Sequence, residues 1–291
     1  MGKPLEQFHA IVGVPRSGST LVANVLCQNP EIWVSTHGYV LPALCASASH
    51  TLSLAQEWKA LRYLDREGED ERAIRTIRAT VESWCADDDR PIIIDKQRDW
   101  ADHALLLSRV FPETKIIALV RDLRDVAASV EYHHRKTAHL DVAPSRLKKR
   151  IIHRFDDIFS EGEQKSGVIA RALAGLQDLY FRNLPNVLWV KYEDLVRSPK
   201  HVFARIYKHL DIPSFEHDFE NVANVQVEPD WILDDKFPHR GEGKVESKPS
   251  KRDLINSEVY APLLEGFQWY WKKWYPDALN ESAGKATSRG G

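Results

Sequence analysis

The residues best suited to chemistry in this chain form a glycine-framed loop near its start. Residues 11–20 read IVGVPRSGST, with four residues between Gly13 and Gly18. This is the frame of a phosphate-binding loop, in which backbone N–H groups at a helix N-terminus surround an anion. Ser19 stands where nucleoside triphosphatases carry the lysine that neutralises the β and γ phosphates. The loop therefore predicts a phosphate site for a donor with less charge at its transferred group than ATP.

The loop also contains a cation that can replace this lysine. Arg16 lies inside the glycine frame, and the N–H groups that follow it can close around one phosphate at the start of a helix. The predicted phosphate ligands are Arg16, Ser17, Gly18, Ser19 and Thr20. A glycine- and serine-rich turn without a ligand is the alternative.

A second basic motif follows an apolar run in the middle of the chain. Residues 115–130 read KIIALVRDLRDVAASV, which predicts a strand before Arg121 and a helix after it. An arginine at the end of a strand can donate two hydrogen bonds to a phosphate, and Ser129, two turns into the helix, adds a hydroxyl. The alternative is a solvated cluster of alternating charges that caps the helix.

The two motifs together resemble those of the sulfotransferases that use 3′-phosphoadenosine 5′-phosphosulfate (PAPS). The similarity is closest to the Golgi-type branch that acts on tyrosine and carbohydrate, which writes PRSGTT or PRSGST in the loop. The resemblance covers residues 8–275 and includes VKYEDLVRSPKHVFARIYKHLDIP at 190–213, similar to the family's YEDL segment, which we interpret as scaffold. It implies that the loop binds the 5′-phosphosulfate and that Arg121 and Ser129 bind the 3′-phosphate. It also implies 3′,5′-adenosine bisphosphate as product and no required metal.

The resemblance extends to catalytic residues. Counted from Arg16, His37 occupies the place of the catalytic glutamate of tyrosylprotein sulfotransferases, and a neutral imidazole can accept a proton from an attacking hydroxyl. Asp99 is the second candidate for the base, since cytosolic relatives carry their histidine base near this place. Lys96, which follows the run PIIID, would stabilise charge on the departing oxygen together with Arg16. A turn histidine without a task is the alternative for His37.

A later segment, residues 225–250, loosely resembles the family's loop over the nucleotide. It supplies four further candidate phosphate ligands, Arg240, Lys244, Ser247 and Lys248. A solvated loop with scattered lysines is the alternative. His133 and His134 begin a basic stretch that could border an anionic acceptor, help to retain the nucleotide, or form a charged helix face. Their function stays open at this point.

The order of the predicted elements is typical of an α/β protein. We predict a three-layer P-loop NTPase-like fold, with a central parallel sheet flanked by helices and ligands at the C-terminal edge of its strands. We expect one domain over residues 1–279 and a disordered tail over residues 280–291. The predicted strands are 8–14, 31–35, 91–95, 115–120 and 187–191. The predicted helices are 19–28, 40–62, 70–85, 100–110, 123–136, 145–160, 165–183, 199–210 and 257–274.

Composition narrows the classes of partner. The 291 residues carry a formal charge of −2, which gives no general attraction for nucleic acid or membranes. No run approaches the roughly 18 apolar residues of a membrane span, and the first residues lack the apolar core of a secretory signal. The 3 cysteines have no metal-ligand spacing. We therefore expect a cytoplasmic protein with reduced thiols and no metal, acting on a small-molecule, carbohydrate or peptide acceptor.

Two other functions remain open from the sequence. In a P-loop small-molecule kinase that uses ATP and magnesium, Asp95 at the end of PIIID would hold the metal. A catalytically inactive scaffold would bind the nucleotide without transferring a group. The identity of the acceptor and the oligomeric state are not encoded in any motif that we identify.

Overall fold

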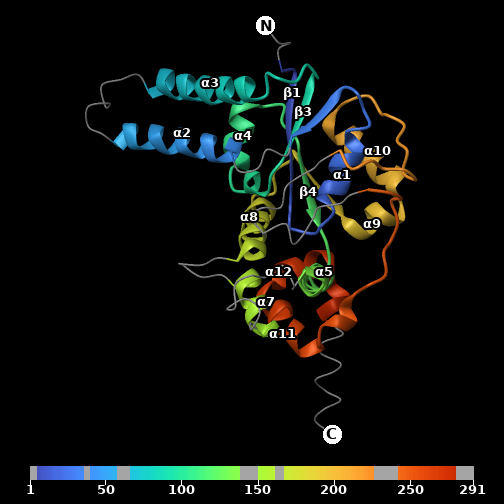
Figure 1. Cartoon of the computed structure of the whole chain (residues 1–291). Coiled ribbons are helices and arrows are strands. Elements are labelled where there is room, and N and C mark those ends of the chain that lie inside the picture. Colours follow the sequence, from blue (N-terminus) through green and yellow to red (C-terminus); the bar gives the residue numbers. More distant parts are fainter. Residues whose placement is uncertain are drawn as a thin grey trace.

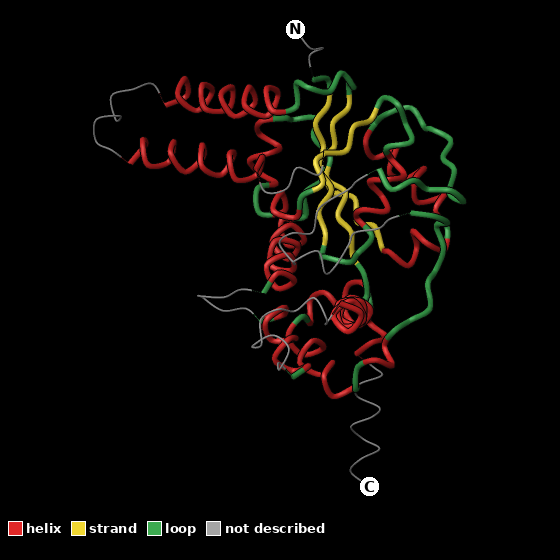
Figure 2. Tube along the Cα trace, in the orientation of Figure 1, coloured by secondary structure: helices red, strands yellow, loops and turns green. Residues whose placement is uncertain are grey.

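The centre of the molecule is one five-stranded parallel sheet with helices on both faces (Figures 1 and 2). The computed structural model describes residues 5–35, 40–57, 66–137, 150–160, 167–225 and 242–279. The strand order is β2-β3-β1-β4-β5, and every pairing is parallel. The strands are β1 (Gln7–Gly13), β2 (Ile32–Ser35), β3 (Ile92–Lys96), β4 (Ile116–Val120) and β5 (Val187–Lys191). The predicted three-layer α/β arrangement is confirmed.

The strands are apolar on both sides because helices cover both faces. In β4 every residue is buried, and successive side chains enter two separate cores. Ile116, Ala118 and Val120 face one core, while Ile117 and Leu119 face the other. This is the alternation of a central parallel strand, which reads as a continuous apolar run in the sequence.

The helices divide between these two cores. The first core is covered mainly by α3, α4, α5, α8, α11 and α12, and the second by α1, α9 and α10. The helix pair α2 and α3 lies side by side and projects away from the sheet (Figure 1). The helices are α1 (Ser19–Leu26), α2 (Val40–Glu57), α3 (Arg66–Trp84), η2 (Arg98–Ala101), α4 (Ala104–Val110), α5 (Leu123–Thr137), α7 (Ile151–Phe159), α8 (Val168–Arg182), α9 (Tyr192–Arg197), α10 (Pro199–Leu210), η5 (Arg252–Leu254), α11 (Ser257–Gly266) and α12 (Gln268–Trp274).

Two predicted helices are wrong because each is interrupted. The predicted helix 100–110 is a 3₁₀ turn, η2, followed by α4; the Gln97 side chain caps η2 by accepting a hydrogen bond from the Arg98 N–H at 2.6 Å. The predicted helix 257–274 breaks at Phe267, whose φ of −116° and ψ of 47° are not helical. Apolar spacing continues across both breaks, so periodicity alone could not find them.

Four further observations bear on what the sequence predicts. Helix α2 is described to Glu57, and the remainder of the predicted helix 40–62 lies outside the described residues. The predicted tail over 280–291 also lies outside them. No helix in the described part of the chain is long and apolar enough to cross a membrane. The three cysteines form no disulfide, and Cys45 and Cys85 are buried.

The last helix, α12, is joined to the end of β4 by one hydroxyl group. Tyr270 is fully buried, and its hydroxyl accepts from the Arg121 N–H at 2.9 Å and donates to the Arg121 carbonyl at 2.8 Å. Tyr270 belongs to an aromatic cluster with Trp269, Trp271 and Trp274. The predicted aromatic stripe is thus core packing, and it also fixes the backbone at Arg121.

We predict that Tyr270→Phe lowers the free energy of unfolding by about 1–3 kcal/mol, because the Arg121 N–H and carbonyl lose a partner in a dry interior. The measurement is equilibrium urea unfolding. Tyr180→Phe is the matched control, since Tyr180 stacks in the same cluster at 5.7 Å from Trp269 and is only half-buried. A Tyr270→Phe protein as stable as the wild type would contradict this account.

Candidate functional site

The glycine-framed loop adopts a conformation that few residues tolerate. Arg16 and Gly18 have φ angles of 70° and 93°, both left-handed, and α1 begins directly afterwards at Ser19. A positive φ is strained for arginine but ordinary for glycine. Within the turn the Ser17 N–H donates to the Val14 carbonyl at 3.2 Å. The turn brings the loop to the N-terminus of α1, where the helix dipole and the first N–H groups favour an anion.

The residues around the loop fit a bound phosphate. A Cβ atom added to Gly18 would lie 2.7 Å from Cδ2 of Tyr192, so only glycine leaves room for both the turn and the ring. The hydroxyl of Ser17 is buried and has no hydrogen-bond partner within the described ranges. A buried hydroxyl without a partner is costly unless a ligand satisfies it. The space required at Gly18 is that expected of a phosphate-binding loop, whereas the Ser17 hydroxyl lies against Gly13 and is not among the described residues that line the cavity.

The loop opens into a cavity of about 930 Å³. Its walls come from the loop and α1, from the end of β4 and α5, from α9, and from a segment that we call the strap, residues 242–251. The lining residues are Arg16, Gly18, Ser19, Thr20, Leu21, Arg121, Asp125, Ser129, His133, Lys136, Tyr192, Glu193, Val196, Arg197, Glu242, Lys244, Glu246, Ser247, Lys248, Pro249, Ser250 and Lys251.

The two predicted phosphate motifs meet in this cavity. Arg16 donates from Nε to the Ser129 hydroxyl at 3.2 Å, and its Nη2 lies 2.9 Å from Nε2 of His133. In return, Nη1 of Arg121 donates to the backbone carbonyl of Arg16 at 2.8 Å. Arg16, Arg121 and Ser129, which are up to 113 residues apart in sequence, therefore form one hydrogen-bonded group.

The side chain of Arg121 is held by an aromatic ring. Its guanidinium lies 4.1 Å from the ring centre of Tyr192, the first residue of α9, and this ring also packs against Gly18. The Arg121 Nε is buried with no hydrogen-bond partner in the part of the chain that the structure describes. The interpretation of the YEDL segment as scaffold needs correction: Leu195 is core, but Tyr192 and Glu193 line the cavity.

The cavity concentrates positive charge. Burial and the neighbouring Arg16, Lys251 and Lys136 lower the pKa of His133 to about 4. Burial and the cations around it, Arg16 first, also lower the pKa of Lys251, whose ammonium lies 3.3 Å from the ring centre of Tyr132. Each charge thus makes its neighbour harder to charge, and an anion between them would relieve this repulsion.

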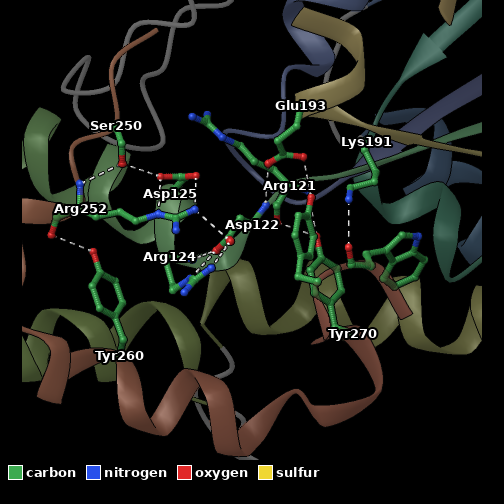
Figure 3. A network of polar contacts seen from close by, with 12 residues as sticks. Arg121, Asp122, Arg124, Asp125, Lys191, Glu193, Ser250, Arg252, Tyr260 and Tyr270 are labelled. Carbon is green, nitrogen blue, oxygen red and sulfur yellow. Dashed lines mark hydrogen bonds and ion pairs between the residues drawn. The ribbon is translucent and has the colours of Figure 1, made fainter. Parts of the chain in front are cut away.

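A carboxylate network anchors the strap to the start of α5, as Figure 3 shows. Arg252 donates to both oxygens of Asp125, at 2.8 and 2.6 Å, and lies 2.9 Å from Asp122. The hydroxyl of Ser250 adds a hydrogen bond to Asp125 at 3.1 Å. Because Lys251 lies between Ser250 and Arg252, this anchor holds its backbone beside the cavity, which Lys251 lines.

The other predicted catalytic residues are Lys96, Asp99 and His37, and they differ in their relation to the cavity. Lys96 ends β3, and its ammonium donates to the hydroxyl of Thr20, a lining residue, at 3.3 Å. Asp99 lies in η2 and is not among the described residues that line the cavity. His37 falls outside the described residues, so its position relative to the cavity is not defined.

The candidate phosphate ligands predicted in residues 225–250 also differ in their relation to the cavity. Ser247 and Lys248 line the cavity. Lys244 also lines it, but its ammonium pairs with Glu220 at 2.8 Å on the exposed side. Arg240 is outside the described residues.

Sequence analysis missed Lys251 and Ser250 and left His133 open. A signal for the first two was present, because SKPSK repeats a Ser-Lys pair within a few residues. Only the folded chain shows that both pairs line the cavity and that Ser250 bonds to Asp125 of α5. The described residues contain no cluster of three or more histidine, cysteine, aspartate or glutamate side chains arranged to hold a metal ion.

A parallel sheet with a glycine-framed loop after β1 and basic side chains at its C-terminal edge defines an α/β protein of the phosphate-loop class. The chain belongs to the sulfotransferase family, whose sequence model matches residues 10–217. The protein-tyrosine sulfotransferase A of Caenorhabditis elegans is 25% identical over 217 residues, which cover 71% of this chain. The chain spans about half, 50%, of that relative's length.

Solved structures share the fold. The mouse sulfotransferase SULT7A1 complexed with PAP has a TM-score of 0.52 at 13% identity, with 98% of this chain and 91% of that chain covered. The sulfotransferase domain from the Synechococcus PCC 7002 olefin synthase has a TM-score of 0.50 at 20% identity, with 92% and 96% covered.

We predict that Gly18→Ala lowers the free energy of unfolding by about 1–2 kcal/mol, since alanine resists a positive φ. We also predict that it weakens the binding of the nucleotide. The new methyl group would displace the Tyr192 ring and with it the guanidinium of Arg121. The measurement is calorimetric titration with adenosine 3′,5′-bisphosphate, for which we expect a loss of affinity of roughly tenfold or more. Gly266→Ala is the control, because no atom lies within 4 Å of its added Cβ. Equal affinities in the two variants would contradict the prediction.

We predict that Asp125→Asn lowers the free energy of unfolding at pH 7 by about 1–3 kcal/mol. Burial raises the pKa of Asp125, but the hydrogen bonds and charge of Arg252 outweigh burial, so that the folded-state pKa lies below its usual value. The contribution is therefore complete above the unfolded-state pKa of about 4 and is lost as the pH falls through the folded-state value. Urea unfolding at pH 7 and pH 3 measures it.

The control for this prediction is Asp178→Asn, which removes an exposed ion pair with Arg182 on α8. Such pairs contribute about 0.3–0.5 kcal/mol. If the two variants lose the same stability at pH 7, or if the loss in Asp125→Asn is independent of pH, Arg252 does not anchor the strap.

Proposed function

We propose that this chain is a sulfotransferase that moves a sulfuryl group from PAPS to a hydroxyl or amine acceptor and releases 3′,5′-adenosine bisphosphate. The observation that carries the proposal is the hydrogen-bonded group of Arg16, Arg121 and Ser129, which joins two phosphate motifs in one cavity. Membership of the sulfotransferase family supports the transfer reaction in general.

In this proposal the chain acts by positioning and by charge. The backbone N–H groups from Ser17 to Thr20 bind the 5′-phosphate, and Arg121 and Ser129 bind the 3′-phosphate. The acceptor oxygen or nitrogen bonds to sulfur in line as the bond from sulfur to the phosphate oxygen breaks. Arg16 and Lys96 stabilise the negative charge that develops on that departing oxygen. Lys96 is suited to this because its ammonium contacts Thr20 at the start of α1.

Residues of the segment 225–250, together with Lys251, would complete the nucleotide site. Ser247 and Lys248 are proposed phosphate ligands that line the cavity, and the anchored Lys251 joins them. Arg240 and Lys244 are proposed with them on the resemblance alone. For Lys244 the ion pair with Glu220 must open or be shared before it can bind an anion.

The proposed general base is His37, with Asp99 as the second candidate. In the sequence His37 comes two residues after Ser35, which ends β2. The loop follows β1, Lys96 ends β3 and Arg121 follows β4, at the same edge of the sheet. The acceptor proton would pass to its imidazole as the bond to sulfur forms.

We predict that His37→Ala reduces the turnover number by about 100-fold or more while leaving the affinity for adenosine 3′,5′-bisphosphate within about twofold, because a general base acts on the acceptor and not on the nucleotide. Turnover is measured with ³⁵S-labelled PAPS and affinity by calorimetry. Asp99→Asn is the parallel variant. Unchanged turnover in His37→Ala, with a loss in Asp99→Asn, would transfer the role to Asp99.

The kinase alternative requires Asp95 to hold magnesium. Asp95 is 1% exposed, and its carboxylate accepts a hydrogen bond from Nε1 of Trp100 at 2.6 Å. It is not among the described residues that line the cavity. This favours a structural role for Asp95 and supports the sulfotransferase over the kinase.

The acceptor is proposed only as a class: a small molecule, a carbohydrate or a peptide with a free hydroxyl or amine. The Caenorhabditis elegans relative is named for protein tyrosine, which makes peptide tyrosine one candidate to test. Screening mixtures of these acceptors with ³⁵S-labelled PAPS would separate them.

The test of the proposal is ligand-dependent thermal stability. A PAPS-dependent sulfotransferase gains stability from adenosine 3′,5′-bisphosphate without magnesium, and a kinase gains it from ATP with magnesium. At a ligand concentration 100 times the dissociation constant the gain is about 2.7 kcal/mol. Stabilisation by ATP and magnesium alone would refute the proposal. Binding of the bisphosphate without transfer to any acceptor would support the alternative function, a catalytically inactive scaffold.

A further inference from the structure

His133 occupies a position that the proposed phosphate ligands do not yet use. It lies on α5 one turn after Ser129, and both side chains contact the guanidinium of Arg16, at 2.9 and 3.2 Å. Residues four apart share one face of a helix. His133 and Ser129 therefore face the same part of the cavity, the part that we assign to the 3′-phosphate.

The contact with Arg16 defines the state of the imidazole. A guanidinium can only donate hydrogen bonds, so Nε2 of His133 accepts, and the ring in this structure is neutral with its proton on Nδ1. Its edge-on contact with the ring of Tyr132, at 5.4 Å between centres, holds the plane in place. Nε2, the ring nitrogen that contacts Arg16 at the cavity, therefore carries no proton.

Among the described residues, the charges that shift His133 are positive and come from three elements: Arg16 from the loop, Lys251 from the strap, and Lys136 from α5. Four further cations line the same cavity: Arg121 at the end of β4, Arg197 of α9, and Lys244 and Lys248 of the strap. Four carboxylates also line the cavity, Asp125, Glu193, Glu242 and Glu246. Asp125 is engaged with Arg252, and Glu193 accepts from the hydroxyl of Tyr275 at 2.8 Å.

A phosphate dianion in this place reverses the electrostatics. It neutralises the cations that keep the imidazole uncharged, and it offers acceptor oxygens both to Arg16 and to a protonated Nε2. We propose that His133 is a third ligand of the 3′-phosphate, which it binds as an imidazolium after taking up one proton from solvent. This inference rests on the proposed function, because it assumes a ligand with a phosphate on its ribose.

Proton uptake gives the binding reaction a defined pH dependence. In the protein without ligand, His133 is neutral above about pH 4 because burial and the nearby cations lower its pKa. If the bound phosphate raises this pKa, binding takes up a proton at every pH between the two values, and the affinity rises as the pH falls through the upper one. The phosphate itself, with a second pKa of about 6, changes affinity in the opposite direction, but it does so equally in a variant without the imidazole.

The experiment is calorimetric titration of the full chain with adenosine 3′,5′-bisphosphate, in two buffers of different ionisation enthalpy, from pH 5.5 to pH 8. We expect the wild type to take up roughly half a proton or more beyond His133→Gln at pH 6.5. We expect His133→Gln to bind about tenfold more weakly at pH 6 and about twofold more weakly at pH 8. Adenosine 5′-phosphate, which lacks the 3′-phosphate, should bind equally to both proteins.

His134→Gln is the matched control, since it changes the neighbouring histidine on the same helix and should behave as the wild type. A measurement without any variant is the NMR titration of the His133 imidazole: it should be neutral at pH 6 in the free protein and charged in the complex. An imidazole that stays neutral in the complex, or equal proton uptake in the wild type and His133→Gln, overturns this inference alone. A wild type that binds the bisphosphate no better than adenosine 5′-phosphate overturns the proposed function as well.

Discussion

The constraint on which this structure depends is the mutual repulsion of the cations gathered in one cavity. Arg16, Arg121 and Lys251 come from three distant segments, and their partial burial reduces the access of the water that would screen their charges. The protein holds them in place with neutral or negative partners. These are the Ser129 hydroxyl, the Tyr192 ring and the anchor at Asp125. The cavity is therefore arranged for an anion before any ligand arrives.

The parallel sheet makes this concentration of charge possible. The phosphate loop follows β1, Lys96 ends β3, Arg121 follows β4, and Tyr192 follows β5. Because all five strands run in one direction, these residues reach the same edge of the sheet, where helix N-termini also point. Helix packing on both faces leaves this edge as the place where polar side chains can gather without disrupting a core.

The C-terminal helices stabilise the site from behind. The Tyr270 hydroxyl donates a hydrogen bond to the Arg121 carbonyl. The Glu193 carboxylate accepts hydrogen bonds from the Asp122 N–H at 3.2 Å and from the Tyr275 hydroxyl. Such a buried network is favourable only when every member is satisfied, so it holds the end of β4 in one conformation. The aromatic stripe of the last helices thus contributes to the geometry of the phosphate site as well as to the core (Figure 3).

The sequence by itself determined the sheet and the glycine-framed loop, and it predicted Arg121 and Ser129 as ligands of one phosphate. The signals for the sheet and the loop are local: apolar runs and a glycine spacing. Only the tertiary structure decided that Arg16 reaches Ser129 and His133, that Tyr192 supports Arg121, and that Lys251 turns over the cavity. These contacts join residues far apart in the chain. No spacing encodes them, because the packing of helices and strands, and not the local conformation of each segment, brings such residues together.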